Sequence, residues 1–211
     1  DIDKVADGVA LAGFANAGQV CISAQRILVE DKAYGDLTDA LQARVEGITT
    51  GDPLADGTKM GPMIRESDAE RVESWIQEAV AGGARLVAGG SRSGTLHQPT
   101  VLADVTPDMR VSRDEVFGPA VALTRVSDID EAIAIANDTN YGLSASIFTQ
   151  DIDRAIKYAQ NVESGNIHIN WGTMWRADMM PYGGLKDSGM GKEGPKCAIQ
   201  EMTESKMIVI H

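Results

Sequence analysis

Apolar residues recur at helical spacing in two long segments of the chain, residues 34–48 and 67–81. This spacing places the apolar side chains on one face of a helix. The positions are Leu37, Leu41, Val45 and Ile48 in the first segment, and Val72, Ile76 and Val80 in the second. We expect a third helix from Asp1 to about Asn16, because the acidic Asp1 and Asp3 suit the N-terminus of a helix.

Short apolar runs bounded by turn residues predict β-strands. In the second half of the chain they alternate with helical segments, which implies parallel pairing with right-handed crossovers. The alternating elements are strand 120–126, helix 129–137, strand 143–148, helix 152–161 and strand 165–170. The other expected strands are 26–30, 85–88, 100–103 and 207–210, and residues 89–95 are expected to form a surface loop. The pattern predicts an α/β fold.

Composition narrows the class of protein further. With 211 residues, of which 43% are apolar, the chain suits one large domain or one domain with a small annex. Two cysteines provide no disulfide framework, which favours a reducing, cytoplasmic compartment. The three histidines are too scattered in the sequence to predict a metal site.

Charge and hydropathy bear on the partners. The net charge is −12 and no basic run occurs, so we expect neither nucleic acid nor an anionic membrane as a partner. No apolar stretch approaches the roughly 20 residues of a membrane span.

Residues 14–21, Phe-Ala-Asn-Ala-Gly-Gln-Val-Cys, place a cysteine just after a Gly-Gln turn. An isolated cysteine is more often a buried core residue. A nucleophilic thiol, by contrast, needs backbone donors and a positioned electrophile beside it. The segment resembles the active-site signature of the aldehyde dehydrogenase superfamily, Phe-x-x-x-Gly-Gln-x-Cys, with Phe14, Gly18, Gln19 and Cys21 at its fixed positions. The resemblance implies that Cys21 is the catalytic nucleophile.

A second segment, Glu115-Val-Phe-Gly-Pro119, resembles the Glu-x-Phe-Gly-Pro segment of the same family. The alternative is a simple turn that leads into the next strand, since Gly-Pro is turn chemistry. The resemblance implies that Glu115 holds the hydroxyls of the nicotinamide-side ribose of NAD or NADP and that Phe117 supports the nicotinamide ring. A carboxylate can accept from two neighbouring hydroxyls, and a phenyl ring offers a flat apolar face.

A third segment, residues 181–193, is similar to the family's Pro-Phe-Gly-Gly-x-Lys-x-Ser-Gly-x-Gly-x-Glu run, so the resemblance covers the whole chain. It implies that Tyr182 lies in the wall of the substrate pocket and that Glu193 matches a glutamate proposed to relay protons. Glu193 is equally consistent with a surface acid near a helix N-terminus. Residues 189–194 also match Gly-x-Gly-x-x-Gly, but no apolar strand precedes them, so we interpret them as a mobile loop.

Arg176 gives an indication of the substrate class. The segment around it resembles that of relatives that act on small aldehydes with an anionic or hydroxyl group. A guanidinium can bind a carboxylate or phosphate with two hydrogen bonds. The alternative is a structural ion pair with Asp178 or another acid. Val20 stands where non-phosphorylating glyceraldehyde-3-phosphate dehydrogenases can carry arginine, which weakens a phosphate interpretation.

The fold that the resemblance implies is an open, mostly parallel twisted sheet with helices on both faces. Residues 1–202 would form the catalytic domain, and residues 203–211 a C-terminal strand that adds to a sheet of the neighbouring subunit in a homodimer or homotetramer. The family's general-base glutamate, an oxyanion-binding asparagine and an adenosine-binding lysine should precede Asp1. We therefore expect a C-terminal catalytic fragment without turnover of its own, and the choice between NAD and NADP stays open.

Two alternatives to hydrolytic aldehyde oxidation also stay open. The chain could serve as a binding or assembly module, or it could belong to a relative that releases the thioester to coenzyme A. Glu193 and the Pro-Tyr-Gly-Gly run favour hydrolysis.

Overall fold

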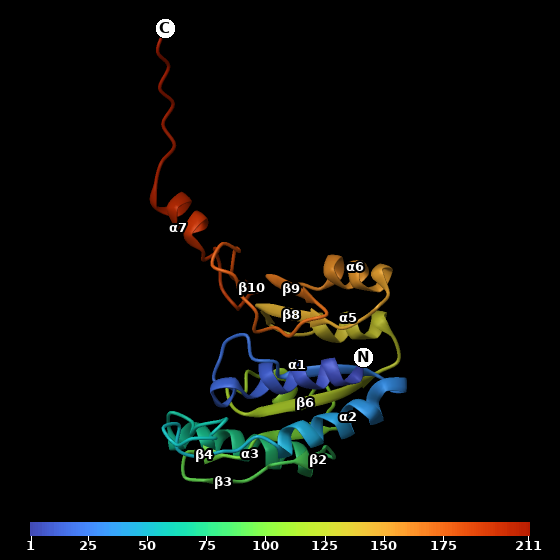
Figure 1. The fold of residues 1–211 in the computed structure, drawn as a ribbon. Helices are drawn as coiled ribbons and strands as arrows, with labels where there is room; N and C mark the ends of the chain where they lie inside the picture. Colours follow the sequence, from blue (N-terminus) through green and yellow to red (C-terminus); the bar gives the residue numbers. More distant parts are fainter.

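The computed structural model describes residues 1–211. Figure 1 labels most of its elements. The helices are α1 (Ile2–Phe14), the 3₁₀ turn η1 (Ala15–Gly18), α2 (Asp31–Glu46), α3 (Glu66–Ala81), α4 (Arg110–Arg113), α5 (Ile129–Asn137), α6 (Ile152–Asn161) and α7 (Pro195–Met202). The strands are β1 (Arg26–Glu30), β2 (Arg85–Ala88), β3 (Arg92–Ser93), β4 (Leu96–His97), β5 (Thr100–Ala103), β6 (Ala120–Val126), β7 (Tyr141–Gly142), β8 (Ser144–Ile147), β9 (Asn166–Ile169) and β10 (Leu185–Lys186).

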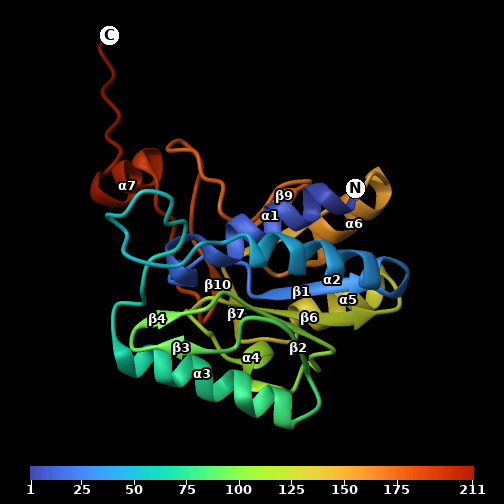
Figure 2. The same cartoon turned by 60° about the horizontal axis from the view of Figure 1, so that its bottom comes forward.

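The main sheet has four strands in the order β1-β6-β5-β2. β6 runs parallel to both of its neighbours, β1 and β5, and only β2 is antiparallel. Figure 2 shows α1 and α2 on one side of this sheet and α3 on the other. β6 is buried along nearly its whole length, with only Arg125 exposed, because both of its faces are covered. The structure confirms the α/β class and the mostly parallel sheet.

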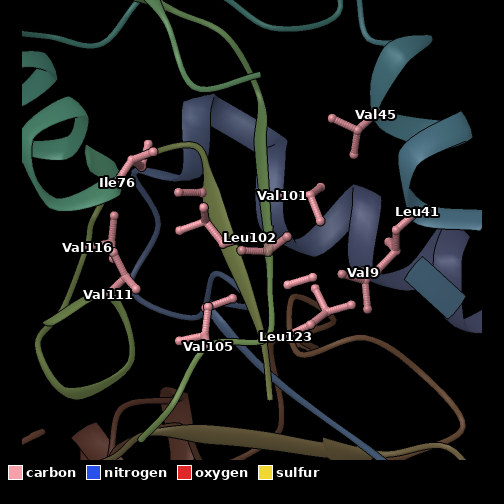
Figure 3. Close-up of a cluster of buried hydrophobic side chains, with 14 of the residues drawn as sticks. Val9, Leu41, Val45, Ile76, Val101, Leu102, Val105, Val111, Val116 and Leu123 are labelled. Carbon is pink, nitrogen blue, oxygen red and sulfur yellow. The ribbon is translucent and has the colours of Figure 1, made fainter. Parts of the chain in front are cut away.

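The hydrophobic core lies around β5 and β6. Val101 and Leu102 of β5 and Leu123 of β6 are fully buried (Figure 3). Leu41 of α2 and Ile76 of α3 reach the same cluster from the two covering helices. The predicted apolar faces of these two helices pack into the core, except that Val80 of α3 is 41% exposed and Ile48 lies beyond the end of α2.

The second half of the chain departs from the predicted sheet. β8 and β9 form a separate parallel pair, so the expectation of successive pairing from strand 120–126 through strand 143–148 is wrong. The reason is that β1 and β5 already occupy both edges of β6, which leaves no edge for β8. Residues of β1 and β8 instead line a common cleft.

The C-terminal segment forms no strand within the single chain, and its pairing with a neighbouring subunit stays a prediction. Residues 203–211 form no strand, and they extend away from the body of the molecule (Figure 1). Met207, Ile208, Val209 and Ile210 are between 66% and 91% exposed. The reason is that a strand needs a neighbour for its backbone groups, and no strand of this chain lies beside them.

Smaller differences concern the ends of elements. The helix expected over 34–48 spans Asp31–Glu46, and the expected surface loop 89–95 contributes to a two-stranded hairpin, β3–β4. A membrane crossing demands a helix longer and more apolar than any found in this structure.

Candidate active site

Cys21 follows a strained turn that ends helix α1. Asn16, Ala17 and Gly18 have φ angles of 51°, 55° and 68°, all in the left-handed region. That region is costly for residues other than glycine, and such strain concentrates at functional sites. The turn brings the chain from the buried end of α1 to the surface, where Cys21 is exposed.

Gly18 brings the first two motifs into direct backbone contact. A Cβ atom built on Gly18 would lie 2.1 Å from the carbonyl oxygen of Gly118. Gly118 is itself packed against α3, since a Cβ atom there would lie 2.5 Å from Val72. Both glycines are therefore required by space, and the cysteine turn rests on the Phe117–Pro119 segment.

Two glutamine side chains lock this arrangement. Gln19 accepts a hydrogen bond from the backbone N–H of Ile64 at 3.0 Å and donates to the carbonyl of Asn16 at 3.1 Å. Gln25 accepts from the N–H of Val116 at 2.8 Å. Its amide nitrogen donates to the carbonyl of Asp114 at 2.7 Å and to that of Val111 at 2.9 Å. Gln25 thereby holds the segment on both sides of Glu115.

The predicted nucleophile and the predicted cofactor residues line one pocket. Its walls include Cys21, Glu115 and Phe117, together with Gly18 and Gln25. Glu115 is exposed, and the Phe117 ring is 43% exposed. Phe117 has a φ angle of 45°, so the backbone accepts strain while this ring stays open to the pocket.

Tyr182 contacts the thiol directly. Its hydroxyl oxygen lies 2.9 Å from Cys21 Sγ, and the residue is only 7% exposed. Burial raises the pKa of Tyr182 well above its usual value, and the hydrogen bond with Cys21 raises this pKa further. The structure thus places Tyr182 beside Cys21.

Arg176 and Glu193 form an ion pair behind Tyr182. Arg176 Nη2 lies 3.2 Å from Glu193 Oε2, and the guanidinium carbon is 4.2 Å from the centre of the Tyr182 ring. Arg176 therefore pairs with Glu193 and not with Asp178. The Glu193 side chain is 68% exposed and lies just before α7, so its surroundings are those of a surface acid.

Two functional features escaped the sequence analysis. Gln25 was overlooked, although an amide side chain at the start of an apolar strand and four residues after Cys21 is a usable signal. The hydrogen bond between Cys21 and Tyr182 joins residues 161 positions apart, and no local pattern reports such a contact.

Known proteins match this chain along its whole length. The model of the aldehyde dehydrogenase family matches residues 1–208. A 3-sulfolactaldehyde dehydrogenase of Priestia megaterium is 48% identical over all of this chain, which covers 44% of that relative. The crystal structure of aldehyde dehydrogenase 21 from Physcomitrella patens, in complex with the reaction product succinate, superimposes with a TM-score of 0.95 at 40% identity. It matches all of this chain and 44% of its own length.

A second solved structure gives the same result. NADP-dependent glyceraldehyde-3-phosphate dehydrogenase from Bacillus halodurans has a TM-score of 0.91 at 39% identity, covering 94% of this chain and 41% of its own length. The chain belongs to the aldehyde dehydrogenase family. It spans less than half the length of these relatives, and the solved relatives include complexes with NADP and with NAD⁺.

Proposed function

We propose that this chain carries the nucleophile and the nicotinamide-side contacts of an enzyme that oxidises an aldehyde to a carboxylic acid with NAD or NADP. The observation that carries the proposal is the single pocket that Cys21 shares with Glu115 and Phe117. A nucleophile and a cofactor site must adjoin, because hydride leaves the same carbon that the sulfur attacks.

The residues of this pocket fit the nicotinamide end of the cofactor. Glu115 is an exposed carboxylate that can accept hydrogen bonds from two ribose hydroxyls. Phe117 offers an exposed ring face beside Cys21. The cofactor, when bound, supplies the hydride acceptor, and the protein supplies its orientation.

The reaction begins with a carbon–sulfur bond. The Cys21 thiolate adds to the carbonyl carbon, and the carbonyl electrons move to oxygen. The backbone N–H of Cys21 donates to no other group of the chain, so it is free to donate to this oxyanion. Loss of hydride from the carbon leaves a thioester on Cys21. Water then cleaves the carbon–sulfur bond, which releases the carboxylic acid and the thiol.

Hydrolysis also requires a base that accepts a proton from water. Glu193 is a carboxylate whose backbone pairs with that of Tyr182, but its side chain is held in an ion pair with Arg176 and makes no contact with the sulfur. We therefore assign the principal base to the remainder of the longer protein and give Glu193 at most a relay role.

The proposed substrates are small aldehydes with a hydroxyl or anionic group. The relatives carry names such as 3-sulfolactaldehyde, lactaldehyde and glyceraldehyde-3-phosphate dehydrogenase. Arg176 can bind such an anion only by sharing its guanidinium with Glu193. In the longer protein, Arg176→Leu should raise KM for carboxylated or phosphorylated aldehydes and leave propanal unaffected. Equal losses on both classes would assign Arg176 to the ion pair alone.

The exposed tail is proposed as an assembly element. The apolar residues of 207–210 would gain backbone partners by adding to a sheet of a second subunit, giving a dimer or tetramer. Sedimentation of the full chain should show association that is lost when residues 203–211 are removed. A monomeric full chain would contradict this assignment.

The decisive test of the proposed function is Cys21→Ser in the longer protein. The variant should lose aldehyde-dependent NAD(P)H formation and keep its affinity for the cofactor, because sulfur acts in chemistry and not in cofactor binding. Cys197→Ser is the matched control and should keep full activity. Retained turnover by Cys21→Ser would refute the proposal.

A further inference from the structure

We propose that Tyr182 is a catalytic residue whose hydroxyl donates a hydrogen bond to Cys21 Sγ and so stabilises the thiolate that attacks the aldehyde. This inference rests on the proposed role of Cys21 as nucleophile. It gives Tyr182 a direct part in the chemistry, in addition to the place in the substrate-pocket wall that the family resemblance implies.

The geometry places the phenol directly on the sulfur. The separation of 2.9 Å between Tyr182 Oη and Cys21 Sγ is a hydrogen-bonding distance. A thiolate can only accept hydrogen bonds, so the phenol must be the donor whenever the sulfur is charged. No proton is transferred in this interaction, because the phenol keeps its hydrogen throughout.

Contacts with Glu193 and Arg176 hold the Tyr182 side chain in place beside the sulfur. The backbone N–H of Tyr182 donates to the carbonyl of Glu193 at 3.1 Å, and the N–H of Glu193 donates back to the carbonyl of Tyr182 at 2.6 Å. The Arg176 guanidinium covers the ring at 4.2 Å and pairs with Glu193. The same residues thus fix both ends of the tyrosine, and its hydroxyl needs little reorganisation when the thiolate forms.

The phenol also remains protonated where the enzyme would work. Burial is the main cause of the raised pKa of Tyr182, and the nearby Cys21 and the charge of Glu193 act in the same direction. Arg176 lowers this pKa, and its effect is smaller. A neutral phenol beside the sulfur is a donor at neutral pH, and a hydrogen bond to the charged form of a group favours that form.

Tyr182→Phe removes this hydroxyl and keeps the ring. The rate at which iodoacetamide labels Cys21 should fall by about 10-fold at pH 7, as expected for loss of a hydrogen bond to a charged group. The rates of the variant and the wild type should converge at high pH, where the thiol ionises without help. Tyr141→Phe, which removes the hydroxyl of a half-exposed tyrosine in β7, should leave the rate unchanged.

The outcomes separate a hydrogen bond from a structural role. An equal rate for Tyr182→Phe and wild type at pH 7 would overturn the inference. So would a loss that persists unchanged at high pH, because a misplaced thiol would react slowly at every pH. Cys21 labelled before Cys197 in the wild type supports the nucleophile itself, so failure of the Tyr182 inference is distinguishable from failure of the proposed function.

A second measurement does not depend on the folding of Tyr182→Phe. With ¹³C at the ring carbon that bears the hydroxyl, the Tyr182 resonance should move when Cys21 is replaced by alanine. The resonances of Tyr34, Tyr141 and Tyr158 should stay in place. An unchanged Tyr182 resonance would show that the phenol makes no bond to the sulfur.

Discussion

Gly18→Ala tests the close contact between the cysteine turn and the segment around Gly118. The added methyl would stand 2.1 Å from the Gly118 oxygen and 2.5 Å from its carbonyl carbon, and Gly18 has a φ angle of +68°. The left-handed conformation costs about 1 kcal/mol for alanine. Displacing packed backbone adds about 1–3 kcal/mol. We therefore expect the free energy of unfolding to fall by about 2–4 kcal/mol, a large part of a typical total of about 5–15 kcal/mol.

Gly94→Ala is the matched control, because Gly94 has a φ angle of +58° and a Cβ atom there would meet nothing within 4 Å. This variant should lose only about 1 kcal/mol. In chains of this size 1 kcal/mol corresponds to about 2–4 °C in Tm, so the two variants should be well separated in urea and thermal unfolding. The steric argument would be refuted if the two variants lost the same free energy of unfolding to within about 0.5 kcal/mol, which is the usual scatter of such comparisons.

Three further outcomes are expected. Limited iodoacetamide treatment of the folded chain should label Cys21 before Cys197, because Cys21 is exposed in the pocket and Cys197 is half-buried in α7. Peptide mass mapping that finds Cys197 labelled first would count against Cys21 as the nucleophile. In the longer protein, Glu115→Gln should slow hydride transfer, so that kcat falls and an isotope effect appears with deuterated aldehyde. An unchanged kcat without an isotope effect would show that Glu115 does not bind the cofactor ribose. His97 is 1% exposed, its Nε2 has no hydrogen-bond partner, and burial lowers its pKa in the folded chain. The neutral imidazole therefore contributes its full stabilisation at pH values above the pKa of His in the unfolded chain, about 6.5. This stabilisation is lost as the pH falls towards the lower pKa of the folded chain. The unfolding free energy of wild type should therefore decline more steeply from pH 7 to pH 5 than that of His97→Phe, and equal slopes would show that folding does not shift the pKa of His97.

Local elements were predictable because their signals lie within a few residues. The bounds of β1, β5, β6 and α6 agree with the prediction from apolar runs, turn residues and helical spacing. The separation of β8 and β9 from the main sheet was not predictable in this way. It depends on β1 taking the free edge of β6, and these two strands are about 90 residues apart.

The candidate site divides along the same line. Cys21, Glu115 and Phe117 were identified from short motifs, and the structure brings them into one pocket. Their relation to Tyr182 and Arg176 required the fold, since an aromatic ring and a guanidinium in a loop carry no signal about which distant atom they face. The ion pair of Arg176 with Glu193 shows this most directly, because the sequence left open whether its partner was Asp178 or another acid.

The three hydrogen bonds of Gln25 have a consequence for which residues of the proposed site can change independently. One amide couples the segment that carries Cys21 to the segment that carries Glu115, so these two parts keep a constant spacing. Arg176 comes from a different part of the chain, where it pairs with Glu193 and makes no hydrogen bond with this amide. Under the proposed function, substitutions at Arg176 would therefore change which aldehyde is bound while Gln25 keeps the spacing of Cys21 and Glu115.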